Sequence, residues 1–101
     1  MSPPTVHQIV DTLRTRAMVG VTQLGPLVGM SAAWGQRVLD GTICPDLATA
    51  DRIAQVLSAR DEERIVLLKA VSRVKLTRAG ITGADLDRVV DVLLLVYRGR
   101  T

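Results

Sequence analysis

Apolar residues along the chain recur with the spacing of amphipathic helices, and no segment alternates as a strand would. The first helical face comprises Val6, Ile9, Val10, Leu13 and Ala17, which follow the i, i+3, i+4, i+7 pattern. The same period continues in five further segments, namely 22–28, 31–39, 46–59, 61–77 and 82–98. The pattern predicts an all-α protein, a compact bundle of about six helices.

Residues that start and stop helices stand between these segments. Thr5 opens a capping box for the first helix, and Ser31 and Asp46 stand where the third and fourth begin. Thr22 is the expected cap of the second helix. Glycine commonly follows the last turn of a helix, so the first helix is expected to end at Gly20.

Two glycines predict a rigid corner between the second and third helices. Gly25 stands where a larger side chain would push the two helices apart, and Gly29 supplies the positive φ of the turn. Met30 is expected to fill the core beneath the turn, and Val38 to face inward. The corner would hold segment 31–39 in one orientation.

The stretch TQLGPLVGMSAAWGQRVLDG, followed by PDLATADRIAQVL, resembles the helix-turn-helix of the lambda-repressor-like class. This class includes phage Cro and CI proteins and the XRE regulators, and typically reads TQ..LA...GVS...ISR...G, then P...TL..IA..L. The resemblance covers residues 5–59. Pro26 and Gly35 depart from the pattern. Because Gly35 replaces a buried aliphatic residue, it is expected to leave a hole that Trp34 fills.

The resemblance implies a sequence-specific repressor of transcription, such as a temperate-phage immunity repressor or a Cro-like regulator. Segment 31–39 would lie in the major groove of double-stranded operator DNA. The DNA-binding residues so implied are Thr22, Gln23, Ser31, Ala32, Ala33, Trp34, Gln36 and Arg37. Arg37 suits guanine and Gln36 adenine, while Gln23 would hold a phosphate from its side chain and its helix terminus. Trp34 has a second interpretation as a packing residue.

Composition and charge say less about function than the helical pattern and the motif do. Hydrophobic residues make up 48% of the 101 residues but aromatic ones only 2%, and the net charge of +3 permits a polyanionic partner without requiring one. A basic run follows residue 63, comprising Arg64, Lys69, Arg73, Lys75 and Arg78. Lys69 and Arg73 share a helix face. They are candidate phosphate contacts, although a solvated face is the alternative interpretation.

The sixth segment is apolar on nearly all sides, so it must be covered on more than one side. The first and fifth helices could cover it within a monomer, or a second subunit could do so in a homodimer formed through residues 82–98. The candidate dimerisation residues are Leu86, Val90, Leu93, Leu94 and Tyr97.

The predicted helices divide the chain into a DNA-binding domain, 1–59, and a helical extension, 60–101. The alternative function is an antitoxin-type autoregulator whose C-terminal helices bind a partner protein.

The chain offers few groups for catalysis. One cysteine, Cys44, and one histidine, His7, cannot assemble a metal cluster, and no phosphate-binding glycine loop is present. We therefore expect no enzymatic activity, no cofactor and no small-molecule substrate. The sequence also shows neither a signal peptide nor a membrane segment, which favours a cytoplasmic protein.

Overall fold

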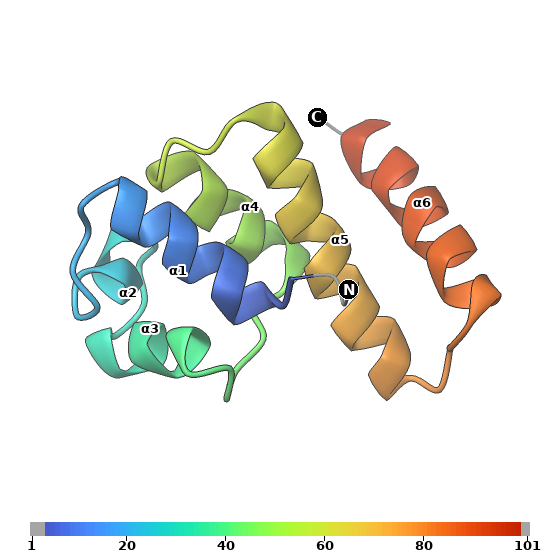
Figure 1. The fold of residues 1–101 in the computed structure, drawn as a ribbon, viewed down its shortest axis with the longest axis horizontal. Coiled ribbons are helices and arrows are strands. Elements are labelled where there is room, and N and C mark those ends of the chain that lie inside the picture. The colour runs from blue at the N-terminus through green and yellow to red at the C-terminus, as the bar shows by residue number, and fades with distance from the viewer. Residues whose placement is uncertain (1–3, 100–101) are drawn as a thin grey trace.

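The computed structural model describes residues 4–99, and this part of the chain contains six helices and no strand (Figure 1). The helices are α1 (Val6–Arg16), α2 (Leu24–Leu27), α3 (Ala32–Leu39), α4 (Leu47–Val56), α5 (Asp61–Arg78) and α6 (Ala84–Gly99). The all-α prediction and the number of helices are confirmed.

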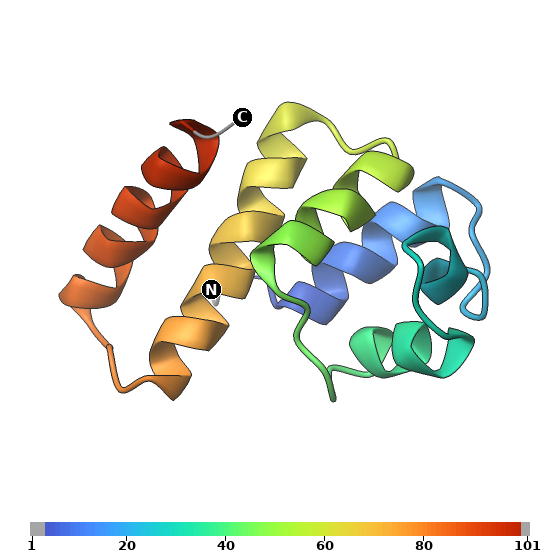
Figure 2. The same cartoon turned by 180° about the vertical axis from the view of Figure 1, so that it is seen from behind.

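The helix α5 connects the two ends of the bundle. It packs against α1 and α4 on one side and against α6 on the other, whereas α2 and α3 lie at the end remote from α6 (Figures 1 and 2). One continuous hydrophobic core joins all six helices. Its members include Val10, Leu24, Val38, Ile53, Val71 and Val90. Burial of such side chains supplies most of the stability of a fold of this size.

The predicted helix starts at Thr5, Ser31 and Asp46 are confirmed. The Thr5 backbone N–H donates to Gln8 Oε1 at 3.0 Å, and Thr5 Oγ1 accepts from the Gln8 N–H, which completes the capping box. Ser31 Oγ accepts from the Trp34 N–H at 3.0 Å. Asp46 Oδ1 accepts from the Thr49 N–H at 2.7 Å. Each bond satisfies a donor that a helix start would otherwise leave free.

The end of α1 differs from the prediction. The helix stops at Arg16 rather than Gly20, because Met18 takes the left-handed conformation with φ 59°. The N–H of Met18 donates to the Thr15 carbonyl, and that of Val19 donates to the Arg14 carbonyl, each at 3.1 Å. This pairing is a Schellman motif. Met18 therefore supplies the left-handed residue that ends α1, a role that the sequence analysis assigned to Gly20.

Two ion pairs link α5 to its neighbours, and one of them is partly buried. Asp51 on α4 is only 7% exposed and accepts from Arg64 on α5, whose Nε and Nη2 both donate to its carboxylate, the latter at 3.1 Å. Arg16 on α1 donates to Glu63 at 2.6 Å. Because the Asp51 carboxylate is buried, loss of Arg64 would leave its charge uncompensated, so the pair favours the arrangement in which α4 and α5 bring these side chains together. The sequence pattern did not single out Asp51.

Candidate nucleic-acid interface

The corner between α2 and α3 is built on contact between two backbones. A Cβ at Gly25 would lie 1.9 Å from the Ser31 carbonyl oxygen, and a Cβ at Gly35 would lie 2.6 Å from the Gly25 nitrogen. Gly29 has φ +79°, and the Met30 N–H donates to the Gly25 carbonyl at 2.8 Å. The predicted roles of Gly25 and Gly29 are confirmed. The corner holds α3 at a distance from α2 that only glycine permits.

The predicted hole beside Gly35 is absent. The backbone of Gly25 occupies the space in which a larger residue at position 35 would place its Cβ. Trp34 therefore has no cavity to fill, yet it is half-buried and packs against the core. Its packing interpretation is supported, and its contact with DNA stays a prediction.

Met30 does not fill the core as expected, because its side chain is 41% exposed. Leu24 in α2 and the C-cap residue Val28, four residues apart, point inward instead and are buried. Val38 is fully buried, as predicted. The core beneath the turn is thus complete without the methionine.

The outer face of α3 presents three of the predicted DNA-binding residues together. Ala33, Gln36 and Arg37 are all exposed, and their spacing of three and four places them on one side of the helix. Among the side chains that the structure describes, which end at Val96, those of Gln36 and Arg37 make no hydrogen bond or ion pair with the rest of the protein. Their donors and acceptors are therefore free for a ligand. Ser31 is exposed and Ala32 half-buried at the start of the same helix.

Thr22 and Gln23 are exposed in the turn before α2, where their contacts with DNA stay a prediction, but the cap predicted at Thr22 is wrong. The N-cap is Gln23 rather than Thr22, and it makes no side-chain capping bond. Gln23 Oε1 instead accepts from the Gly20 N–H at 2.7 Å, and the Gln23 N–H donates to the Gly20 carbonyl at 3.0 Å. Only the side-chain NH₂ group of Gln23 is left for a phosphate.

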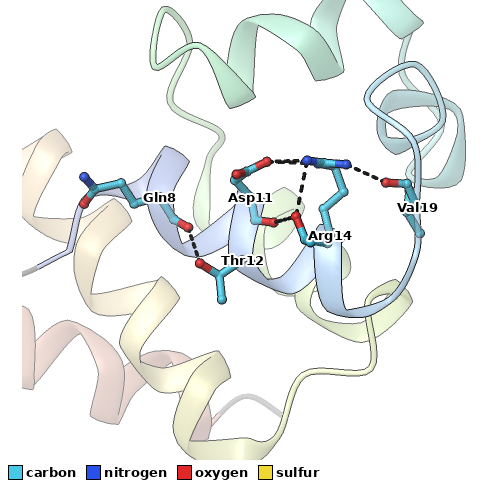
Figure 3. Close-up of polar contacts among 6 residues, drawn as sticks. Gln8, Asp11, Thr12, Arg14 and Val19 are labelled. Atoms are coloured by element: carbon cyan, nitrogen blue, oxygen red, sulfur yellow. Dashed lines mark hydrogen bonds and ion pairs between the residues drawn. The ribbon is translucent and has the colours of Figure 1, made fainter.

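Arg14, which is not part of the apolar face predicted for the first helix, holds the loop that carries these two residues. Figure 3 shows its guanidinium between Asp11 and the Val19 carbonyl. The bonds measure 2.6 Å from Nη2 to Asp11 Oδ1 and 2.8 Å from Nη1 to the Val19 oxygen. Because only 18% of the Arg14 side chain is exposed, solvent competes weakly for these contacts. Arg14 thereby ties the loop before α2 to α1.

The candidate phosphate contacts Lys69 and Arg73 lie on the face of α5 that meets α6. Lys69 Nζ is 3.6 Å from Asp91 Oδ1, and Arg73 Nη2 is 3.4 Å from Asp87 Oδ1. All four side chains are at least one-third exposed, so each pair adds little stability. The pairing with Asp91 and Asp87 accounts for these two cations without DNA.

The predicted dimerisation residues are divided between two faces of α6. Leu86, Val90 and Leu94, four residues apart, point toward α5 and pack into the core, and Val90 and Leu94 are 1% and 5% exposed. The prediction that these three form a dimer interface is wrong, because they are already covered within the chain. Leu93 is exposed, and the side chain of Tyr97 lies outside the described residues.

A different face of α6 remains uncovered. Val92, Leu93, Leu95 and Val96 are between 36% and 71% exposed, and we call them the outer face of α6. The helix packs chiefly against α5 rather than against both α1 and α5. Clustered exposed apolar residues of this kind mark surfaces that contact other molecules.

Comparison of the chain with protein-family profiles, curated proteins and solved structures returns no significant match. Within the described residues, no three His, Cys, Asp or Glu side chains form a group that could hold a metal ion. None of the described helices is long and apolar enough to cross a membrane.

Proposed function

We propose that this protein is a cytoplasmic, sequence-specific double-stranded DNA-binding protein that represses transcription by occupying an operator. The observation that carries the proposal is the outer face of α3. Gln36 and Arg37 project from a helix that backbone contact holds rigidly against α2. Rigid presentation of side chains is what direct recognition of base edges requires, and Arg with guanine and Gln with adenine are the commonest pairings.

The resemblance of residues 5–59 to the lambda-repressor-like pattern supports the same class. It is what points to repression, in the manner of a phage immunity repressor or a Cro-like regulator. No catalytic step or cofactor is part of this proposal.

The proposal is tested by fluorescence anisotropy on a duplex recovered by selection from a random pool. Arg37→Ala should weaken binding by about tenfold or more, since one bidentate base contact is worth about 1–3 kcal/mol. Arg52→Ala is the matched control, because Arg52 is likewise exposed but lies on α4. Wild-type affinity in Arg37→Ala, at the same salt concentration, would count against α3 as the recognition helix.

The outer face of α6 supports a second candidate function. Its four exposed apolar side chains suit either a second copy of this chain or a partner protein, as in an antitoxin-type autoregulator. Light scattering on the purified chain separates the two. A dimer favours self-association, whereas a monomer that binds the product of a neighbouring gene favours the antitoxin.

A further inference from the structure

Two exposed cations, Lys75 and Arg78, stand at the C-terminal end of α5. Unlike Lys69 and Arg73, they form no salt bridge with any carboxylate in the described part of the chain. The three-residue spacing places them side by side on the helix. They form a compact positive patch, the α5-end patch.

The α5-end patch lies beside the loop that follows α3. The positive charges of Lys75 and Arg78 both act to lower the pKa of the Cys44 thiol, against the larger rise caused by burial. The charge of Lys75 also contributes to the lowered pKa of Asp46, whose main cause is the bond from the Thr49 N–H. Both cations therefore lie within electrostatic range of Cys44, and Lys75 lies within range of Asp46 as well.

The same loop is bonded to the recognition helix. The N–H groups of Thr42 and Ile43 donate to the Arg37 carbonyl at 2.9 and 3.2 Å. Figures 1 and 2 place α3, this loop and the C-terminal end of α5 along one edge of the molecule, with α1 above α3. The α5-end patch and α3 therefore lie along the same edge of the molecule, on either side of this loop (Figures 1 and 2).

The charge distribution gives this patch a role. Residues 1–59 hold four Lys or Arg and four Asp or Glu, so the predicted DNA-binding domain has no net charge, and the surplus of +3 belongs to residues 60–101. Binding to DNA depends strongly on cations that neutralise phosphates. If residues 1–59 contact the base edges, the excess positive charge that neutralises nearby phosphates has to come from residues 60–101.

We infer that Lys75 and Arg78 contact backbone phosphates beside the major groove that α3 occupies. This inference rests on the proposed function. The phosphates that border a major groove lie on both sides of an inserted helix. A patch separated from α3 by one loop can therefore reach a bordering strand, and it would position the protein on the duplex without selecting its sequence.

The competing role for these cations is purely structural. Basic side chains in the last turn of a helix offset the partial negative charge of its free carbonyl groups. In that role, loss of Lys75 and Arg78 would lower the stability of the protein but leave DNA binding unchanged at temperatures where it stays folded. The two roles therefore differ in what they predict for binding.

The test compares two double variants with the wild type. Lys75→Gln with Arg78→Gln removes the patch, and Lys69→Gln with Arg73→Gln removes the same charge from the same helix on the face toward α6. Dissociation constants are measured by anisotropy over a series of salt concentrations, on a selected duplex and on a scrambled duplex of equal length. Circular dichroism confirms that each variant is folded.

For two phosphate contacts, the logarithmic salt slope of the patch variant should be shallower than that of the wild type by about 1.8 on both duplexes. The control variant should keep a wild-type slope. Equal slopes in the two variants, or a wild-type slope in the patch variant, would overturn the inference, as would a wild type that binds neither duplex. If the wild type prefers neither duplex while the patch variant loses slope, the sequence-specific function fails but the phosphate contact stands.

Discussion

Gly25→Ala tests the corner between α2 and α3 most sharply. The added Cβ would lie 1.9 Å from the Ser31 carbonyl oxygen, whereas a carbon and an oxygen in close contact stay about 3.3 Å apart. The two segments must therefore separate by about 1.4 Å at this point. Both obstacles, the carbonyl of Ser31 and the nitrogen of Gly35, are backbone atoms, so no side chain can rotate away.

Overpacking of this kind typically costs about 1–3 kcal/mol, and a backbone obstacle places Gly25→Ala at the upper end. A loss of about 3 kcal/mol corresponds to a fall in Tm of about 12–24 °C for a domain of this length. Gly29→Ala is the control, because its Cβ meets nothing within 4 Å. The control adds only left-handed strain, about 1–2 kcal/mol.

The assay is urea unfolding followed by circular dichroism on the wild type and the two variants. The expected order of stability is wild type, then Gly29→Ala, then Gly25→Ala. A Gly25→Ala variant as stable as Gly29→Ala would refute the close approach of α2 and α3.

Three further predictions concern other parts of the chain. The pKa of the Asp46 carboxyl group is lowered mainly by the bond from the Thr49 N–H. The ionised carboxylate therefore stabilises the fold at pH values above the pKa of the unfolded chain, and this stabilisation is lost as the pH falls below about 4. Asp46→Asn, which keeps a capping oxygen but carries no charge, should show a smaller loss of stability on acidification. Met18→Gly should stabilise the protein by about 0.5–1 kcal/mol, because it relieves left-handed strain at a side chain that packs on nothing, being 90% exposed. If the outer face of α6 forms a homodimer, Leu93→Lys should produce a monomer in light scattering.

Each of these predictions has a distinct contradiction. If Asp46→Asn and the wild type lost equal stability on acidification in urea titrations, the Asp46 carboxylate would not contribute to the pH dependence of stability. A Met18→Gly variant with a lower midpoint would mean that φ 59° stores little strain. If a Leu93→Lys protein still dimerises, the dimer interface does not include the outer face of α6. Val90 is buried against α5, so Val90→Ala should lower the stability of the protein instead of changing its oligomeric state.

The sequence predicted those features that depend on neighbouring residues. Capping at Thr5, Ser31 and Asp46 is local chemistry, and the turn at Gly29 needs a positive φ that glycine supplies. The end of α1 was wrong because the rule that places glycine after a helix is a preference, which Met18 overrides. Gly35 was misjudged for another reason. Its role depends on Gly25, ten residues earlier, and the pattern that predicted a close approach at Gly25 does not show that Gly35 is the residue it meets.

The two faces of α6 show the same limit. Leu86, Val90 and Leu94 have helical spacing, but so do Val92 and Val96, and periodicity alone does not say which set meets α5. The register between α5 and α6, which pairs Lys69 with Asp91 at 3.6 Å, is likewise a property of packing. Side chains on a face already defined by a motif, as on α3, could be predicted as exposed. Their partners could not.

The central claim, that α3 recognises a DNA sequence, is tested most directly by selection of bound duplexes from a random pool. We predict that the wild-type protein enriches one sequence motif, and that Arg37→Ala loses preference at one position of it while remaining folded. A wild type that recovers no motif, or an Arg37→Ala protein that recovers the same motif with the same preference at every position, would contradict it.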